Sequence, residues 1–157
     1  MNQMLQMKLH PLWEGPAVVV DVRGPVTRTS KYLDYDENGH PIERFKLRRT
    51  YTLVFETQAR KDRQFFETQS FTVHQHKEGK TETSSTYRNK LCRILGLPLE
   101  TRPEAMKGAK GWVCVKHKPA KFRKQPFNDI DWRLSRELRE GEDIISSETY
   151  NRKDYER

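Results

Sequence analysis

Apolar and polar residues alternate with a period of two in several segments, which is typical of strands with one buried face. The clearest segment is 49–57, where Tyr51, Leu53 and Phe55 share one face and Thr50 and Thr52 the other. The other candidate strands are rich in β-branched and aromatic residues. We predict five strands, at 17–23, 49–57, 64–74, 111–117 and 127–134.

One segment has a helical period instead. Tyr87, Leu91, Ile94 and Leu95 recur at positions i, i+4, i+7 and i+8, and Gly96 ends the pattern. We therefore predict one amphipathic helix of about three turns. It falls between the third and fourth expected strands.

A hairpin is expected between the first two strands. Turn residues at 36–39 (DENG) divide the range 31–45 into two halves that carry apolar side chains. Gly24 and Pro25 are expected to break or bulge the first strand. The expected core combines alternate strand positions with the helical stripe: Val18, Val20, Tyr51, Leu53, Phe55, Val73, Leu91, Ile94, Leu95, Val113, Val115, Ile130 and Trp132.

Periodicity is weak at both ends of the chain. We divide it into an N-terminal arm (1–14), one domain (15–136) and a charged tail (137–157) that we expect to be flexible. Residues 135–157 hold five Lys/Arg and seven Asp/Glu, a net charge of −2, whereas the whole chain carries +8. Residues 1–134 therefore carry +10, opposite in sign to the tail.

Composition limits the size of the core and suggests the partner. Hydrophobic residues make up 34% of the 157 residues and charged residues 33%. A net charge of +8 favours polyanions such as nucleic acid. With no membrane-length apolar run and no signal-peptide core, we expect a soluble, cytoplasmic protein whose Cys92 and Cys114 are reduced.

Three strands, a helix and two further strands follow the order of the OB-fold, a five-stranded barrel. The range 17–134 resembles phage- and plasmid-type single-stranded DNA-binding proteins with this fold. SSTYRNKLCRILGLP and GAKGWVCVKHKPAKFRKQPFNDIDW carry the resemblance. It implies binding without catalysis or cofactor, beside replication or recombination proteins of a phage or mobile element; the extra hairpin departs from a minimal OB-fold.

Cations gather in two places. The range 106–125 holds seven Lys/Arg and no acidic residue, and a second group enters the strand at 49–57. Cations can follow a phosphate backbone while aromatic rings stack on bases. The expected nucleic-acid-binding residues are Arg44, Lys46, Arg48, Phe66, Lys107, Lys110, Trp112, Lys116, Lys118, Lys121, Phe122, Arg123 and Lys124, with Tyr32, Tyr35 and Phe65 as further stacking candidates.

Metal chemistry is poorly supported. The range 34–39 (DYDENG) begins like a calcium-binding loop, but Phe45 stands where the loop needs a glutamate. His74 and His76 lack a third ligand at a recognisable spacing, as do Asp129 and Asp131. We expect no metal and no enzyme activity, and leave two alternatives open: a protein–protein interaction module of the same fold, and a metal-dependent nuclease. The sequence also leaves the oligomeric state open.

Overall fold

The structure is a computed structural model that describes residues 9–76, 82–83, 86–121 and 126–155. This part is mainly β-structure, with a single α-helix, α1 (Thr86–Ile94). The strands are β1 (Trp13–Tyr35), β2 (Pro41–Thr57), β3 (Gln64–Glu67), β4 (Phe71–His76), β5 (Glu82–Thr83), β6 (Lys110–Lys118) and β7 (Phe127–Ile130). They form one antiparallel sheet in the order β5-β4-β2-β1-β6-β7, with β3 also paired to β2.

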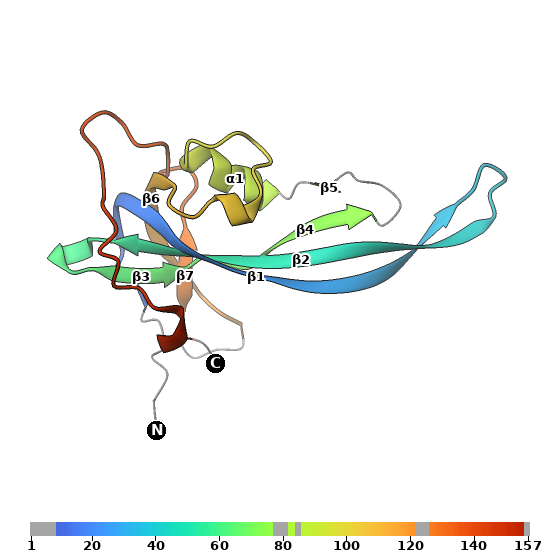
Figure 1. The fold of residues 1–157 in the computed structure, drawn as a ribbon, viewed down its shortest axis with the longest axis horizontal. Helices are drawn as coiled ribbons and strands as arrows, with labels where there is room; N and C mark the ends of the chain where they lie inside the picture. The colour runs from blue at the N-terminus through green and yellow to red at the C-terminus, as the bar shows by residue number, and fades with distance from the viewer. Residues whose placement is uncertain (1–8, 77–81, 84–85, 122–125, 156–157) are drawn as a thin grey trace, which may run out of the picture.

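The expected hairpin is confirmed and is longer than its sequence pattern suggested. β1 and β2 stay paired from Ala17↔Thr57 to Tyr35↔Pro41, with register shifts at Val19/Asp21 and Arg23/Val26. The second shift is the bulge expected at Gly24 and Pro25. We call residues 26–50 the arm, which projects from the rest of the molecule (Figure 1).

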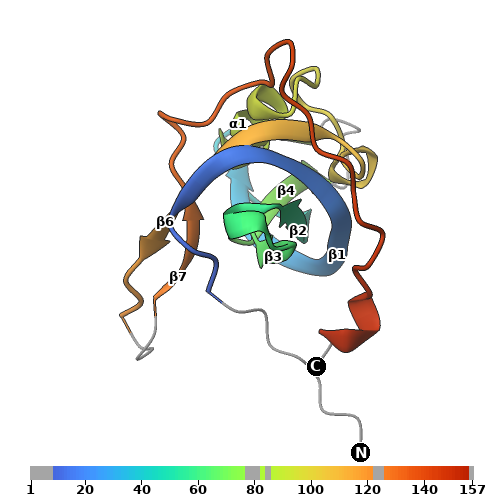
Figure 2. The same cartoon turned by 90° about the vertical axis from the view of Figure 1, so that its left-hand side faces the viewer.

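The structure does not have the five strands that we expected for a barrel. The expected strand at 64–74 divides into β3 and β4, because Thr68 leaves the ladder. The Thr68 hydroxyl oxygen accepts the amide N–H of Leu53 at 3.0 Å, and the Thr68 amide donates to the Leu53 carbonyl at 2.9 Å. Closure is not observed either, because pairing among the described residues ends at β5 and at β7. The sheet nevertheless curls around the core (Figure 2).

The core lies inside this curl, with α1 packed against it. Ten expected core residues are buried in one cluster: Tyr51, Leu53, Phe55, Val73, Leu91, Ile94, Leu95, Val113, Val115 and Ile130. Trp132 is half-buried against that cluster, because β7 ends at Ile130 and a turn follows.

The predicted face of β1 is wrong. Ala17 and Val19 join the core cluster, whereas Val18 is buried on the other face and Val20 is half-buried. Val19 lies opposite Phe55, which belongs to the core, and Val18 opposite Glu56, which does not. The run Ala17–Val20 is continuously apolar, so it contains no alternation from which the face could be chosen.

The C-terminal segment, residues 136–155, lies on the face of the sheet that points away from the core, which we call the outer face. It starts at a bridge between Arg136 and Trp112 of β6 and ends in the short 3-10 helix η3 (Arg152–Asp154). Figures 1 and 2 show it running past the ends of β1 and β2. Two further 3-10 turns are η1 (Ala59–Lys61) and η2 (Pro103–Ala105). No described helix is long and apolar enough to cross a membrane.

Candidate nucleic-acid interface

Strand alternation places several basic residues on the outer face of the arm. Residues 26, 28, 30, 32 and 34 of β1 share this face with residues 42, 44, 46, 48 and 50 of β2, since they are directly paired. We define the basic arm face as Arg28, Tyr32, Arg44, Lys46 and Arg48. The loop 37–39 sets this register, since Asp36 lies opposite His40, whereas a four-residue loop at 36–39 would have placed Leu47 opposite Arg28.

Two arginines face each other across this surface. Arg28 and Arg48 are directly opposite, both are exposed, and neither has an ion-pair partner in the described part of the chain. Like charges in this position destabilise a pair of strands. An anion bound between the two guanidinium groups would remove that repulsion.

Other cations of the basic arm face have partners within the arm. The Arg44 Nε lies 2.8 Å from an oxygen of Asp34, and the Lys46 Nζ lies 5.8 Å from the centre of the Tyr32 ring. His74 of β4 is paired with Arg48 and so lies on the same face. Tyr32 therefore contributes an aromatic ring to a surface that is otherwise cationic.

The second group of expected site residues lies on and beside β6, far along the sheet from the arm. Lys110, Trp112, Lys116 and Lys118 alternate with the core residues of this strand and point outward. Lys116 is paired with Asp129 of β7. Lys107 and Lys121 are exposed in the flanking loops, while Phe122, Arg123 and Lys124 lie outside the described residues.

Part of the β6 surface is occupied by the C-terminal segment. The Lys110 Nζ lies 2.9 Å from an oxygen of Asp143, and the Arg136 guanidinium lies 4.4 Å from the centre of the Trp112 ring. Arg136 also donates two hydrogen bonds to Glu142, at 2.7 and 2.8 Å. Hydrogen bonding from Arg136 lowers the pKa of Glu142 to about 2, so this carboxylate is ionised at neutral pH.

Phe66 does not belong to a binding surface. Its side chain is 0% exposed, and its ring is stacked on Phe55 with the centroids 5.3 Å apart. The prediction that it stacks on a base is therefore wrong: it is a core residue. Phe65, the neighbouring candidate, contacts Tyr150 and Tyr155 of the C-terminal segment.

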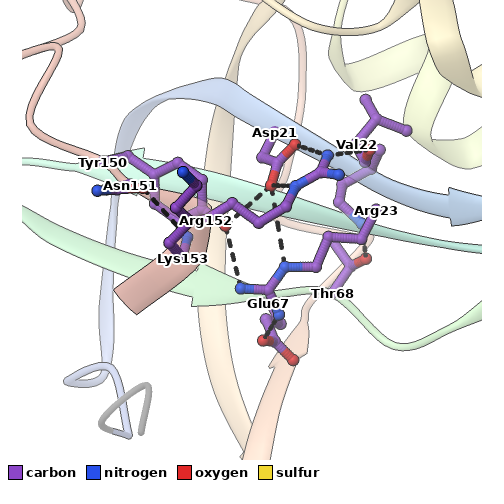
Figure 3. A network of polar contacts seen from close by, with 10 residues as sticks. Asp21, Val22, Arg23, Glu67, Thr68, Tyr150, Asn151, Arg152 and Lys153 are labelled. Atoms are coloured by element: carbon purple, nitrogen blue, oxygen red, sulfur yellow. Dashed lines mark hydrogen bonds and ion pairs between the residues drawn. The ribbon is translucent and has the colours of Figure 1, made fainter. Parts of the chain in front are cut away.

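Residues that no sequence pattern indicated hold the C-terminal segment in place. Asp21 of β1 accepts hydrogen bonds from the Tyr150 hydroxyl and the Arg152 Nε, both at 2.9 Å (Figure 3). Arg23 joins the same network through Tyr150 and through an ion pair with Glu67. Burial alone would raise the pKa of Asp21, but hydrogen bonds from Arg152 and Tyr150 lower it below its usual value.

Glu56 of β2 forms the second attachment. Its carboxylate is fully buried and accepts hydrogen bonds from the Ser147 amide at 2.8 Å and from Arg63 at 3.0 Å. Asp21 and Glu56 lie in segments with ordinary strand patterns. Nothing in the sequence therefore predicted that these two carboxylates are buried and hydrogen-bonded rather than exposed to solvent.

The candidate metal ligands have other roles. Asp36 accepts the amides of Asn38 and His40, at 2.9 and 2.8 Å, and so shapes the turn of the arm. Asp129 and Asp131 each accept a nearby backbone amide. Within the described ranges, no group of three or more His, Cys, Asp or Glu side chains is arranged to hold a metal ion. Cys92 and Cys114 are free thiols.

The chain was compared with protein-family models, with curated proteins and with solved structures. None of the three comparisons finds a match.

Proposed function

We propose that the protein binds single-stranded nucleic acid on the basic arm face, without catalysing a reaction on it. The proposal includes an OB-like character for the domain. The position of α1 between β4 and β6, after a hairpin-linked β1 and β2, supports that assignment. An OB-like domain agrees with the resemblance to phage- and plasmid-type single-stranded DNA-binding proteins. We therefore propose that the bound nucleic acid is DNA.

One observation carries the proposal. Arg28 and Arg48 are held opposite each other, exposed and without an ion-pair partner among the described residues, next to Lys46 and Arg44. The pairing of Arg28 with Arg48 is unfavourable on its own, because adjacent cations repel each other. It becomes favourable when a phosphate backbone lies across it and releases its counterions.

The spacing of the cations suits a phosphate backbone, and a neighbouring ring suits an unpaired base. Arg44, Lys46 and Arg48 occupy alternate positions of β2, so their Cα atoms repeat every ~6.4–6.8 Å along the strand. Consecutive phosphates of a nucleic-acid strand have a comparable separation, so successive cations can lie beside successive phosphates. Tyr32, beside Lys46, offers a ring on which a base can stack, worth about 1–3 kcal/mol.

A fluorescence-anisotropy titration tests the proposal. Single- and double-stranded oligonucleotides of one sequence are titrated with the protein at several salt concentrations. We expect tighter binding of the single strand and a marked loss of affinity with salt. Replacing Arg28, Lys46 and Arg48 by alanine should flatten the slope of log K against log salt by up to about 2.1, or about 0.7 per cation.

A matched variant controls for net charge. Arg60, Arg93 and Arg102 are exposed cations outside the arm, so their replacement by alanine removes the same charge from another surface. This control should lower affinity slightly and leave the slope close to that of the unchanged protein. The proposal is wrong if the two triple variants behave alike, or if neither oligonucleotide binds.

A specific observation also favours the protein-binding alternative. The face of the arm opposite the cations exposes Leu33 and Tyr35, at 60% and 62%, together with Phe45. A protein partner would cover these side chains. Salt-insensitive binding to a protein, with no binding to oligonucleotides, would favour this second function.

A further inference from the structure

The arm has a free edge. β1 is paired with β6 only over Trp13–Val18, and beyond the register shift at Asp21 its one strand partner in the described part of the chain is β2. Figure 1 shows β1 along the lower edge of the arm up to the point where the two strands cross near its tip. Within 26–35 this edge contains no proline and no register shift, two of the devices that prevent pairing with another chain, although it carries the charged side chains of Arg28 and Lys31, which are a third.

The direction of the backbone groups on this edge follows from the turn. The Asp36 amide donates to the His40 carbonyl at 3.0 Å, and the register from there to Val26↔Thr50 is unbroken. Amides therefore point toward β2 at even positions and away from it at odd positions. Pro41, which has no N–H, lies opposite Tyr35, an odd position. Thr27, Thr29, Lys31 and Leu33 thus present their N–H and C=O groups on the free edge.

Ser30, in the middle of this edge, has an unsatisfied hydroxyl. Its Oγ is shielded from solvent and has no hydrogen-bond partner among the described residues. Shielded polar groups of this kind are uncommon, because most find a partner. Ser30 lies near the middle of 26–35, with the edge groups of Thr27 and Thr29 on one side and those of Lys31 and Leu33 on the other, which makes it a suitable centre for pairing.

We propose that this edge pairs in antiparallel fashion with the same edge of a second copy, with a two-fold axis at Ser30. The two Ser30 residues would form a non-hydrogen-bonded pair, with Cα atoms about 4.5 Å apart, close enough for their hydroxyls to hydrogen-bond. Thr29 would face Lys31 of the second copy, and Arg28 would face its Tyr32, which places a cation beside a ring.

The sequence selects this register over its neighbours. A shift of one residue would set the outer face of one arm against the core-side face of the other. Centring the axis on Lys31 would oppose two lysines, which is unfavourable. Centring it on Thr29 would oppose Leu33 to Pro25, which has no N–H for the ladder. Pairing at Ser30 avoids all three penalties.

The dimer would also stabilise the arm. The outer part of the arm, beyond the end of β4, is a two-stranded ribbon, and such ribbons are only marginally stable alone in water. Pairing the two edges produces a sheet of at least four strands. The sheet would also join the two basic arm faces into one continuous cationic surface, with four cations from each copy. A role for this surface in binding nucleic acid rests on the proposed function.

Sedimentation velocity of the full chain, without nucleic acid, tests the pairing. We expect dimers at micromolar concentration. Thr29→Pro removes an N–H that points to the free edge and away from β2, so it should yield monomers, whereas Thr29→Ala keeps that N–H and should remain dimeric. Far-UV circular dichroism establishes that both variants are folded. A monomeric full chain, or a folded dimeric Thr29→Pro variant, would overturn the proposal.

Crosslinking tests the register. Ser30→Cys should form a disulfide-linked dimer under mild oxidation, because the paired Cα atoms lie within the usual disulfide range. Lys31→Cys should not, and the unchanged protein controls for Cys92 and Cys114. Crosslinking of Lys31→Cys but not of Ser30→Cys would exclude the Ser30 axis. Since no oligonucleotide is present, failure here leaves nucleic-acid binding to be decided by its own titration.

Discussion

Asp21 is the residue on which the attachment of the C-terminal segment most depends. Replacing it by asparagine keeps its shape but removes the charge that binds Arg152 and Tyr150. We expect the free energy of unfolding to fall by about 1–3 kcal/mol at neutral pH, as measured by urea denaturation. Asp154→Asn removes an exposed carboxylate of the same segment and should cost little.

The same comparison should depend on pH. The pKa of Asp21 is lower in the folded protein than in the unfolded chain, where it is about 3.9. Its contribution is therefore fully present above the unfolded value and is lost as pH falls through the folded value. The stability difference between the unchanged protein and Asp21→Asn should shrink in acid, and a difference that stays constant with pH would contradict the assigned cause.

Among the helices and strands, the sequence predicted those in which buried and exposed positions alternate regularly. The helix, the hairpin and the strands at β2 and β6 all follow from a clear period or turn, and the structure confirms them. The division between β3 and β4 could not be predicted, because it depends on one threonine hydroxyl that bonds to another strand. The basic arm face depends on whether the turn closes over three or four residues, and the burial of Phe66 depends on how the whole sheet curls.

The C-terminal segment shows why weak periodicity is a poor guide to attachment. Its contacts are made mainly by backbone amides, charged groups and tyrosine rings, which have no helical or strand period. From sequence, such a segment looks like a solvated tail. In the structure it covers part of the outer face, and Ile144 is buried in it.

Truncation tests this attachment. Deleting residues 140–157 removes the groups that bind Glu56 and Asp21, leaving two buried carboxylates without most of their partners. If the loss is about 3 kcal/mol, the melting temperature should fall by about 6–12 °C for a domain of this size. A chain ending at Tyr155 keeps every described contact and serves as the control. Equal melting temperatures for the two chains would show that the segment adds no stability.

For the whole molecule, the distribution of charge decides whether β6 belongs to the binding surface. The C-terminal segment brings acidic groups onto a basic body, and hydrogen bonding from Lys110 lowers the pKa of Asp143. Asp143→Asn frees Lys110 while changing the net charge by one. If nucleic acid reaches β6, the salt slope for single strands should steepen by up to about 0.7. A further Lys110→Ala change should restore the original slope.

Asp154→Asn gives the same change in net charge at the other end of the segment, near Asp21 rather than Lys110. Long-range attraction depends on total charge, so it would raise affinity alike in Asp143→Asn and Asp154→Asn. A local phosphate contact at Lys110 would steepen the slope in Asp143→Asn alone. Equal titrations for the two variants would therefore limit the binding surface to the arm, and unequal ones would extend it along the outer face to β6.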